Sequence, residues 1–298
     1  MRKVRHSELK GWEFLSPTLV LLLFLGVVPI LYVIYLSLFR YDLFSVVGMR
    51  YIGLDNYRKL FSDPVFLYSL ALGLRFAATT CVIQIFLGLI LALFLARNFT
   101  GKGLVRGVIS LPIAVAPVAI GSVWILLTNV EVGPLPYLAE KIFGIQYNIG
   151  LSAGQAFLTV VIMDVWHWTP FVTLAFLAAL TMRPQEPLEA AKIDGASSWQ
   201  SFRYVTLPFL EPVLITVVLI RVMDALRIYD EVRILTDGGP GSATRFVSIH
   251  IAKMVVSQAR YGYSATMSVF VLYLTIVICW LLYILISRRG GAGATKAA

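Results

Sequence analysis

Long apolar segments alternate with short polar ones along most of the chain. Six of them are long enough to cross a bilayer, near residues 15–39, 70–96, 104–128, 154–181, 207–227 and 262–287. A helix rises about 1.5 Å per residue, so roughly 20 apolar residues span the hydrocarbon core. Lipid cannot bond free backbone groups, and each segment is therefore predicted to be helical. The third contains Pro112 and Pro117, which predict a kink or a break.

The composition agrees with an all-α integral membrane protein. Of the 298 residues, 59% are hydrophobic and 14% are charged, whereas soluble domains average about 25% charged residues. The net charge of +9 comes from Lys and Arg that flank the apolar segments. These residues act as orientation signals, so membrane lipid and not nucleic acid is the expected contact. Cys81 and Cys279 lie in apolar segments and the histidines lack ligand spacing, so we expect no disulfide and no metal site.

An even number of spans places both termini on the same side of the membrane. Lys and Arg are more frequent on that side, which predicts that it is cytoplasmic. The predicted organisation is a cytoplasmic segment 1–14, a six-span domain 15–287 and a cytoplasmic tail 288–298. The polar loop 182–206, between the fourth and fifth spans, is then cytoplasmic as well.

This polar loop has the pattern of a folded element. Acidic residues stand near the start of a helical pattern that Pro187 opens, where the helix dipole favours negative charge. Asp194-Gly195 interrupts the pattern, and Ser197 or Ser198 can cap a second short helix. The sequence therefore predicts a helix–Gly–helix unit between two spans.

Catalytic motifs are missing. The sequence has no Gly-x-x-x-x-Gly-Lys-[Ser/Thr] loop, and it has no intramembrane metalloprotease or serine-hydrolase signature. We therefore expect no catalytic residues and no cofactor in this chain.

The polar loop resembles the cytoplasmic coupling loop of permease subunits of binding-protein-dependent ABC importers. That pattern is Glu-Ala-Ala, Asp-Gly-Ala, an aromatic residue and Leu-Pro. The matching residues are Glu189, Ala190, Ala191, Asp194, Gly195, Ala196, Phe202, Leu207 and Pro208. Three further segments resemble the maltose- and glycerol-phosphate-type carbohydrate permeases: Tyr51–Tyr57, Leu111-Pro112 with Trp124, and Leu235–Pro240 with Thr244. The second outer loop departs from the family pattern at Gly133–Pro136.

The resemblance implies a type I ABC importer permease fold, with a coupling helix that docks on a cytoplasmic ATPase. It places the protein in a bacterial or archaeal inner membrane, in contact with lipid. It implies three protein partners: a second permease subunit in a heterodimer, two copies of an ATP-binding subunit that hold ATP and Mg, and an extracytoplasmic sugar-binding protein. Glu189 offers an anionic group to the ATPase, and Ala190 and Ala191 allow close approach. Gly195 permits a sharp turn with positive φ, and Asp194 is expected to cap the helix that follows.

Charged residues inside the fifth span form a second candidate site. Arg221, Asp224 and Arg227 lie roughly on one helix face. A charge at bilayer depth costs about 2.5–3.5 kcal/mol unless it is paired or faces water. Two interpretations stay open: a structural ladder in which Asp224 pairs with either arginine, or a polar sugar site near mid-membrane.

The fourth span offers a second wall for a sugar site, formed by Asp164, His167, Trp168 and Phe171. Aromatic faces suit the C–H surface of a sugar, and a carboxylate suits its hydroxyls. The alternative is that Trp166 and Trp168 only pack against neighbouring helices or lie at the membrane–water interface. Two side chains that are two residues apart on a helix cannot both face one cavity.

The sequence thus predicts half of the translocation pathway of an ATP-driven sugar importer. The alternative is an ion-coupled secondary carrier that works without an ATPase. Such a carrier predicts inverted repeats, and none is visible in the sequence.

Overall fold

The computed structural model describes residues 7–45 and 48–294, and these residues are mainly helical. Two compact units are present. The first comprises the chain up to Pro64 together with Ile251–Tyr273, and the second comprises Val65–His250 together with the chain from Leu274. The predicted cytoplasmic segments 1–14 and 288–298 lie outside the described residues at 1–6 and 295–298.

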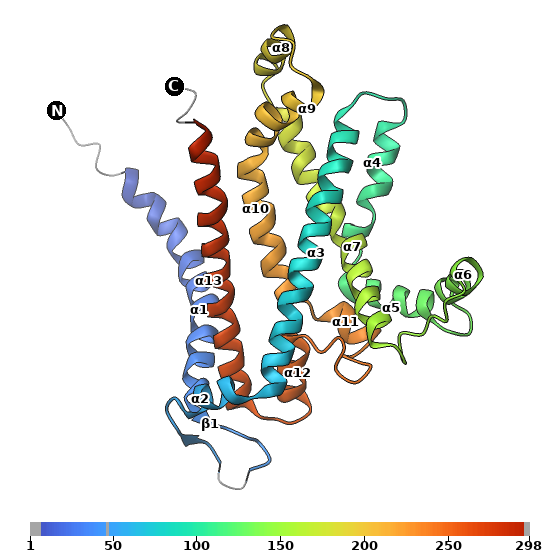
Figure 1. Cartoon of the computed structure of the whole chain (residues 1–298). Helices are drawn as coiled ribbons and strands as arrows, with labels where there is room; N and C mark the ends of the chain where they lie inside the picture. The colour runs from blue at the N-terminus through green and yellow to red at the C-terminus, as the bar shows by residue number, and fades with distance from the viewer. Residues whose placement is uncertain (1–6, 46–47, 295–298) are drawn as a thin grey trace, which may run out of the picture. The chain divides into compact units, whose positions relative to one another are not determined.

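Five of the six predicted spans are present as long apolar helical segments within the described residues (Figure 1). They are Phe14–Ser37 of α1 (Ser7–Ser37), α3 (Pro64–Ala96), α7 (Ala153–Met182), the segment Ser198–Leu235 that contains α10 (Leu207–Leu226), and Tyr261–Ser287 of α13 (Tyr261–Ala294). The predicted positions are confirmed, except that the second segment begins earlier, at Pro64, and the fifth extends beyond 207–227 at both ends, although α10 itself covers Leu207–Leu226.

The third predicted span, 104–128, is not one continuous helix, so it is not among the five long apolar helical segments of the described residues. It consists of α4 (Lys102–Ser110), the short 3₁₀ turn η1 (Pro112–Ala114) and α5 (Pro117–Thr128). Val115 and Ala116 are extended between them. Pro112 and Pro117 have no N–H to donate and both begin a helical segment, so the chain breaks where the prolines predicted a break.

Shorter elements complete the chain. In the first unit, β1 (Phe39–Arg40) pairs antiparallel with β2 (Arg50–Tyr51), and α2 (Asp55–Ser62) follows. The remaining elements are α6 (Pro134–Phe143), α8 (Glu186–Ile193), α9 (Ser198–Ser201), the π-helical turn η2 (Phe202–Thr206), α11 (Asp230–Leu235) and α12 (Val247–Val256).

A buried asparagine explains the pattern Tyr51–Tyr57 in the first unit. The Nδ2 of Asn56 donates to the carbonyl oxygens of Ser37 and Phe39, at 3.1 and 3.0 Å. The hydroxyl of Tyr57 lies 2.8 Å from that of Ser37. These bonds satisfy backbone carbonyls at the end of α1 and fix the chain reversal that follows it.

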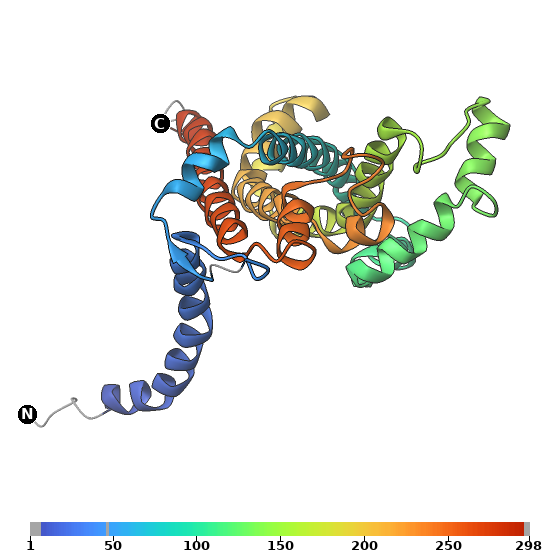
Figure 2. The ribbon, with the colours of Figure 1, turned by 90° about the horizontal axis from the view of Figure 1, so that it is seen from below.

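Helices α3, α7 and α10 form the core of the second unit and lie side by side in both views (Figures 1 and 2). Close packing between α3 and α7 depends on Gly88. A Cβ atom there would lie 2.6 Å from Cγ1 and 2.8 Å from Cβ of Val172. Atoms cannot approach so closely, so only glycine permits this distance between the helices.

We predict that Gly88→Ala lowers the melting temperature of the detergent-solubilised protein, because overpacking costs about 1–3 kcal/mol. Gly107→Ala in α4 is the matched control, since no atom lies within 4 Å of its Cβ position. Alanine also favours a helix over glycine by about 1 kcal/mol, so this control is expected to be neutral or stabilising. Equal effects of the two substitutions would contradict the close packing at Gly88.

Candidate functional site

The polar loop between α7 and α10 forms the predicted helix–Gly–helix unit. We call residues 182–206 the coupling element, after the family loop that they resemble. Helix α8 ends in a Schellman motif, in which the N–H of Ala196 donates to the carbonyl of Ala191 and the N–H of Gly195 to that of Lys192. Gly195 has φ of +75°, as predicted. The two short helices are therefore joined by a defined turn.

The cap of the second helix corrects one sequence prediction. Asp194 was expected to cap α9, but it ends α8 instead. Ser197, one of the two predicted serine caps, is confirmed as the cap: its hydroxyl accepts from the N–H of Gln200, and the Gln200 side chain accepts from the N–H of Ser197. This capping box satisfies the first N–H groups of α9 within the element itself.

The coupling element presents an exposed surface. Glu189 and Ala190 are exposed and Ala191 is half-buried. Large apolar side chains are exposed beside them, among which Ile193 is 86% and Trp199 is 67% accessible. Met182 and Tyr204 are also exposed. Exposed apolar side chains gathered on a well-capped element are typical of a surface that binds a partner.

The two ends of the coupling element meet at Arg183 and Thr206. The Nη1 of Arg183 donates a hydrogen bond to the hydroxyl oxygen of Thr206. Burial lowers the pKa of Arg183, but arginine titrates so far above neutral pH that the side chain remains charged.

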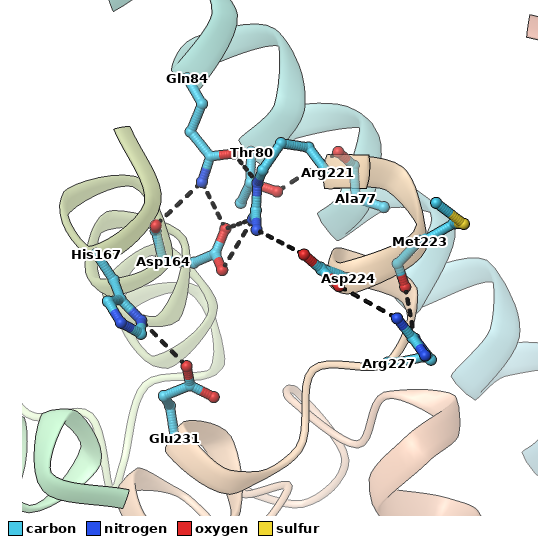
Figure 3. Close-up of polar contacts among 10 residues, drawn as sticks. All are labelled: Ala77, Thr80, Gln84, Asp164, His167, Arg221, Met223, Asp224, Arg227 and Glu231. Carbon is cyan, nitrogen blue, oxygen red and sulfur yellow. Dashed lines mark hydrogen bonds and ion pairs between the residues drawn. The ribbon is translucent and has the colours of Figure 1, made fainter. Parts of the chain in front are cut away.

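A buried polar cluster joins three helices in the middle of the second unit (Figure 3). Arg221 of α10 is fully buried, and its Nε donates to Oε1 of Gln84 in α3 at 2.8 Å. Its Nη2 lies 3.1 and 3.3 Å from the two carboxylate oxygens of Asp164 in α7. The Gln84 amide donates to Oδ2 of Asp164 at 2.8 Å and to the Asp164 carbonyl at 3.0 Å. Each of the three side chains is thus bonded to the other two.

The aromatic residues of the fourth span divide between two sides. The guanidinium of Arg221 lies 4.6 Å from the ring centroid of Trp168, and Phe171 meets Trp168 edge-on at 6.3 Å. Trp166 packs instead against Trp124 of α5, with ring centroids 6.3 Å apart. This separation is the one that a two-residue helical offset requires.

Asp224 lies between the two arginines of its own helix. Its Oδ1 accepts from Nη2 of Arg227 at 3.2 Å, and its Oδ2 lies 3.9 Å from Nη1 of Arg221. The predicted ladder is therefore present, but the main partner of Arg221 is Asp164 on another helix. Among the described residues, Nη1 of Arg221 is buried without a hydrogen bond. The accessible fraction of the side chain rises from 0% at Arg221 to 32% at Asp224 and 70% at Arg227.

His167 has a partner that the sequence did not reveal. Its Nδ1 lies 3.2 Å from Oε1 of Glu231 in α11, and both side chains are buried (Figure 3). Glu231 is held close to α5, where a Cβ at Gly121 would lie 3.0 Å from the Glu231 carbonyl oxygen. A polar residue in an apolar segment, such as Gln84, was the available signal for the three-helix cluster. Glu231 gave no comparable signal, because it follows the fifth span in a polar stretch.

Comparison with known proteins identifies the family. Residues 84–290 match the family model described as "Binding-protein-dependent transport system inner membrane component". The chain is 35% identical over 282 residues to the trehalose/maltose transport system permease protein MalF of Thermococcus litoralis, covering 94% of this chain and 95% of that protein. It is 33% identical over 232 residues to the trehalose transport system permease protein SugA of Mycobacterium tuberculosis, covering 76% and 73%.

The fold agrees with this match. A chain in the crystal structure of a bacterial alginate ABC transporter, in complex with an alginate pentasaccharide-bound periplasmic protein, superposes with a TM-score of 0.81. The superposition covers 95% of this chain and 96% of that chain at 18% identity, which supports the fold alone. The chain belongs to the binding-protein-dependent transport system inner membrane components, the permease subunits of ABC importers.

Proposed function

We propose that this chain forms half of the translocation pathway of an ATP-driven importer for a small oligosaccharide. The observation that carries the proposal is the capped, exposed coupling element between the end of α7 and the start of α10. The chain matches a permease named for trehalose and maltose over 94% of its length. The family match gives no support to the alternative of an ion-coupled carrier.

The proposed topology has six crossings, with both termini and residues 182–206 in the cytoplasm and the membrane domain at 15–287. The third crossing is made by the broken segment α4–η1–α5. Figure 1 supports this, because α4 lies toward the coupling element and α5 toward the opposite end of α7, near α11. Pro112 is buried, whereas Ala114, Val115 and Ala116 in the break are exposed. In a membrane, the backbone groups freed at this break need a partner other than lipid.

The proposed partner of the coupling element is a cytoplasmic ATPase subunit. Glu189 supplies a carboxylate for a basic residue of the ATPase. Ala190 and Ala191 have small side chains, which allow the two backbones to approach closely. The turn beside them is formed by Asp194, Gly195 and Ala196. Two such ATPase subunits bind ATP and Mg, which this chain does not bind. A second permease subunit completes the pathway, and an extracytoplasmic sugar-binding protein delivers the substrate.

The seven candidate pathway residues fall into two groups by burial. Asp164, His167 and Arg221 are buried in pairs that hold helices together. Trp168 and Phe171 are half-buried, Asp224 is partly accessible and Arg227 is exposed. We therefore assign sugar contact to Trp168, Phe171, Asp224 and Arg227, and we assign a structural role to the other three.

For the coupling element, we predict that Gly195→Pro reduces co-purification of the ATPase subunit with the tagged permease about tenfold or more. Proline cannot adopt φ of +75° and has no N–H to donate to Lys192, so it breaks the turn. Gly144→Pro is the matched control, because Gly144 ends α6 with φ of +63° and donates to Glu140 in the second outer loop. Equal loss in both variants would show that the effect is general misfolding.

For the buried cluster, we predict that Arg221→Met strongly lowers the melting temperature, whereas Arg227→Met leaves it nearly unchanged. Removing one partner of a buried ion pair costs about 3–5 kcal/mol, because the other charge is left uncompensated. An exposed pair such as Arg227–Asp224 contributes about 0–1 kcal/mol. A similar small shift in both variants would contradict a structural role for Arg221.

For the pathway, we predict that Asp224→Asn lowers uptake of radiolabelled trehalose or maltose about tenfold or more without changing the melting temperature. Asparagine keeps the shape of the side chain but loses the negative charge, and a charged carboxylate accepts stronger hydrogen bonds from sugar hydroxyls than a neutral amide does. The assay uses the complete transporter in proteoliposomes with its binding protein and ATP. Uptake by this chain alone, driven by an ion gradient, would contradict the proposed function itself.

A further inference from the structure

The coupling element is attached to its two flanking helices in different ways. On one side, α9, η2 and α10 follow one another without a break, and Ser201, Thr206 and Leu207 all have right-handed helical backbone angles. On the other side, α7 ends at Met182, and Arg183 is extended with φ of −67° and ψ of 130° before α8 begins at Glu186. A force on α8 and α9 therefore reaches α10 through a helix, but reaches α7 only through a non-helical connection.

The hydrogen bond from Arg183 to Thr206 joins the end of α7 directly to the start of α10, in parallel with this non-helical connection. Arg183 is the first residue after α7, and Thr206 is the last residue before α10. The Thr206 side chain is buried, at 3% accessibility, and Nε of Arg183 is buried without a partner among the described residues. The bond to Thr206 is thus the guanidinium's one hydrogen bond in the part of the chain that the structure describes.

A second link joins the same two helices deeper in the unit. Asp164 of α7 pairs with Arg221 of α10. Asp164 precedes Arg183 by 19 residues (183 − 164) and Arg221 follows Thr206 by 15 (221 − 206), so the two links are about 20–30 Å apart at 1.5 Å per residue. Two widely separated links oppose both splaying and sliding of one helix against the other.

We propose that Arg183 is a positioning residue for energy coupling, which locks the end of α7 to the start of α10 through Thr206. With the lock closed, displacement of the coupling element moves α7 and α10 together as one rigid arm. With the lock open, α10 follows the coupling element through its continuous helix while α7 lags, so that ATP is hydrolysed without full movement of the pathway. The inference rests on the proposed function, because it assigns the lock to the surface that receives the ATPase.

The test compares Thr206→Val with Thr206→Ser in the complete transporter. Valine has nearly the shape of threonine but no hydroxyl, whereas serine retains the acceptor for Arg183. The measured quantity is uptake of radiolabelled trehalose or maltose per ATP hydrolysed, together with the amount of ATPase subunit that co-purifies. We expect Thr206→Val and Arg183→Met to lower the uptake per ATP about fivefold or more, because a hydrogen bond to a charged group is lost. Thr206→Ser is expected to stay within about twofold of wild type, with normal co-purification in all variants.

The double variant Arg183→Met/Thr206→Val decides whether the two residues act together. A shared hydrogen bond predicts that the double variant is no worse than either single variant. The proposal would be overturned if the losses in uptake per ATP of the two single variants multiplied in the double variant. It would also be overturned if Thr206→Val kept the wild-type uptake per ATP, or if Thr206→Val and Thr206→Ser lost the same amount.

A second readout does not depend on the sugar. Spin labels at the exposed positions Thr181 and Phe209, with Cys81 and Cys279 replaced, report the separation between the end of α7 and the start of α10. We expect this separation to stay the same with and without ATP and vanadate when Thr206 is present, and to change in Thr206→Val. A change of the same size in both backgrounds would overturn the lock. Failure of the proposed function has a different signature, namely a wild-type permease that binds no ATPase or imports neither sugar with ATP.

Discussion

The fold of the second unit depends on one buried charge, the guanidinium of Arg221. A cation at this depth cannot be solvated by lipid, so it requires acceptors from the protein. Asp164 and Gln84 supply them from two other helices, and the Trp168 ring lies against the guanidinium. Because these groups need hydrogen-bond distances, they set the register of α3, α7 and α10 more strictly than apolar contacts do. Gly88 then permits the close packing of α3 on α7 that brings Gln84 to Asp164.

The parts of this structure that sequence could predict are those specified by local chemistry. Continuous apolar segments specify spans, prolines specify the break before α5, and a glycine between helical patterns specifies the turn at Gly195. The site depended on long-range pairing, which single-sequence patterns do not contain. One of the two interpretations paired Arg221 with Asp224 of its own helix, yet its main carboxylate partner, Asp164, lies 57 positions away along the chain. The His167–Glu231 pair spans 64 positions and was missed for the same reason.

The coupling element differs from the core, because its structure is satisfied by its own residues. The Schellman turn uses carbonyls of α8, and the capping box uses only Ser197 and Gln200. An element that is folded before it meets a partner loses less conformational entropy on binding. This self-sufficiency explains how side chains as large as Trp199 and Ile193 remain exposed without collapsing onto the membrane domain. It also means that the exposed surface of the coupling element does not depend on the order of the buried cluster.

Helix α10 connects these two regions. Its first turn follows Thr206, its middle carries Val217 in the apolar core, and its last turns carry Arg221 and Asp224. From Thr206 to Asp224 the chain remains helical over about 27 Å, with Pro212 inside α10. Asp224 is the first charged side chain beyond Arg221 that is accessible. The buried cluster fixes α10 to its neighbours, and the helix itself links the coupling element to the accessible charges of Asp224 and Arg227.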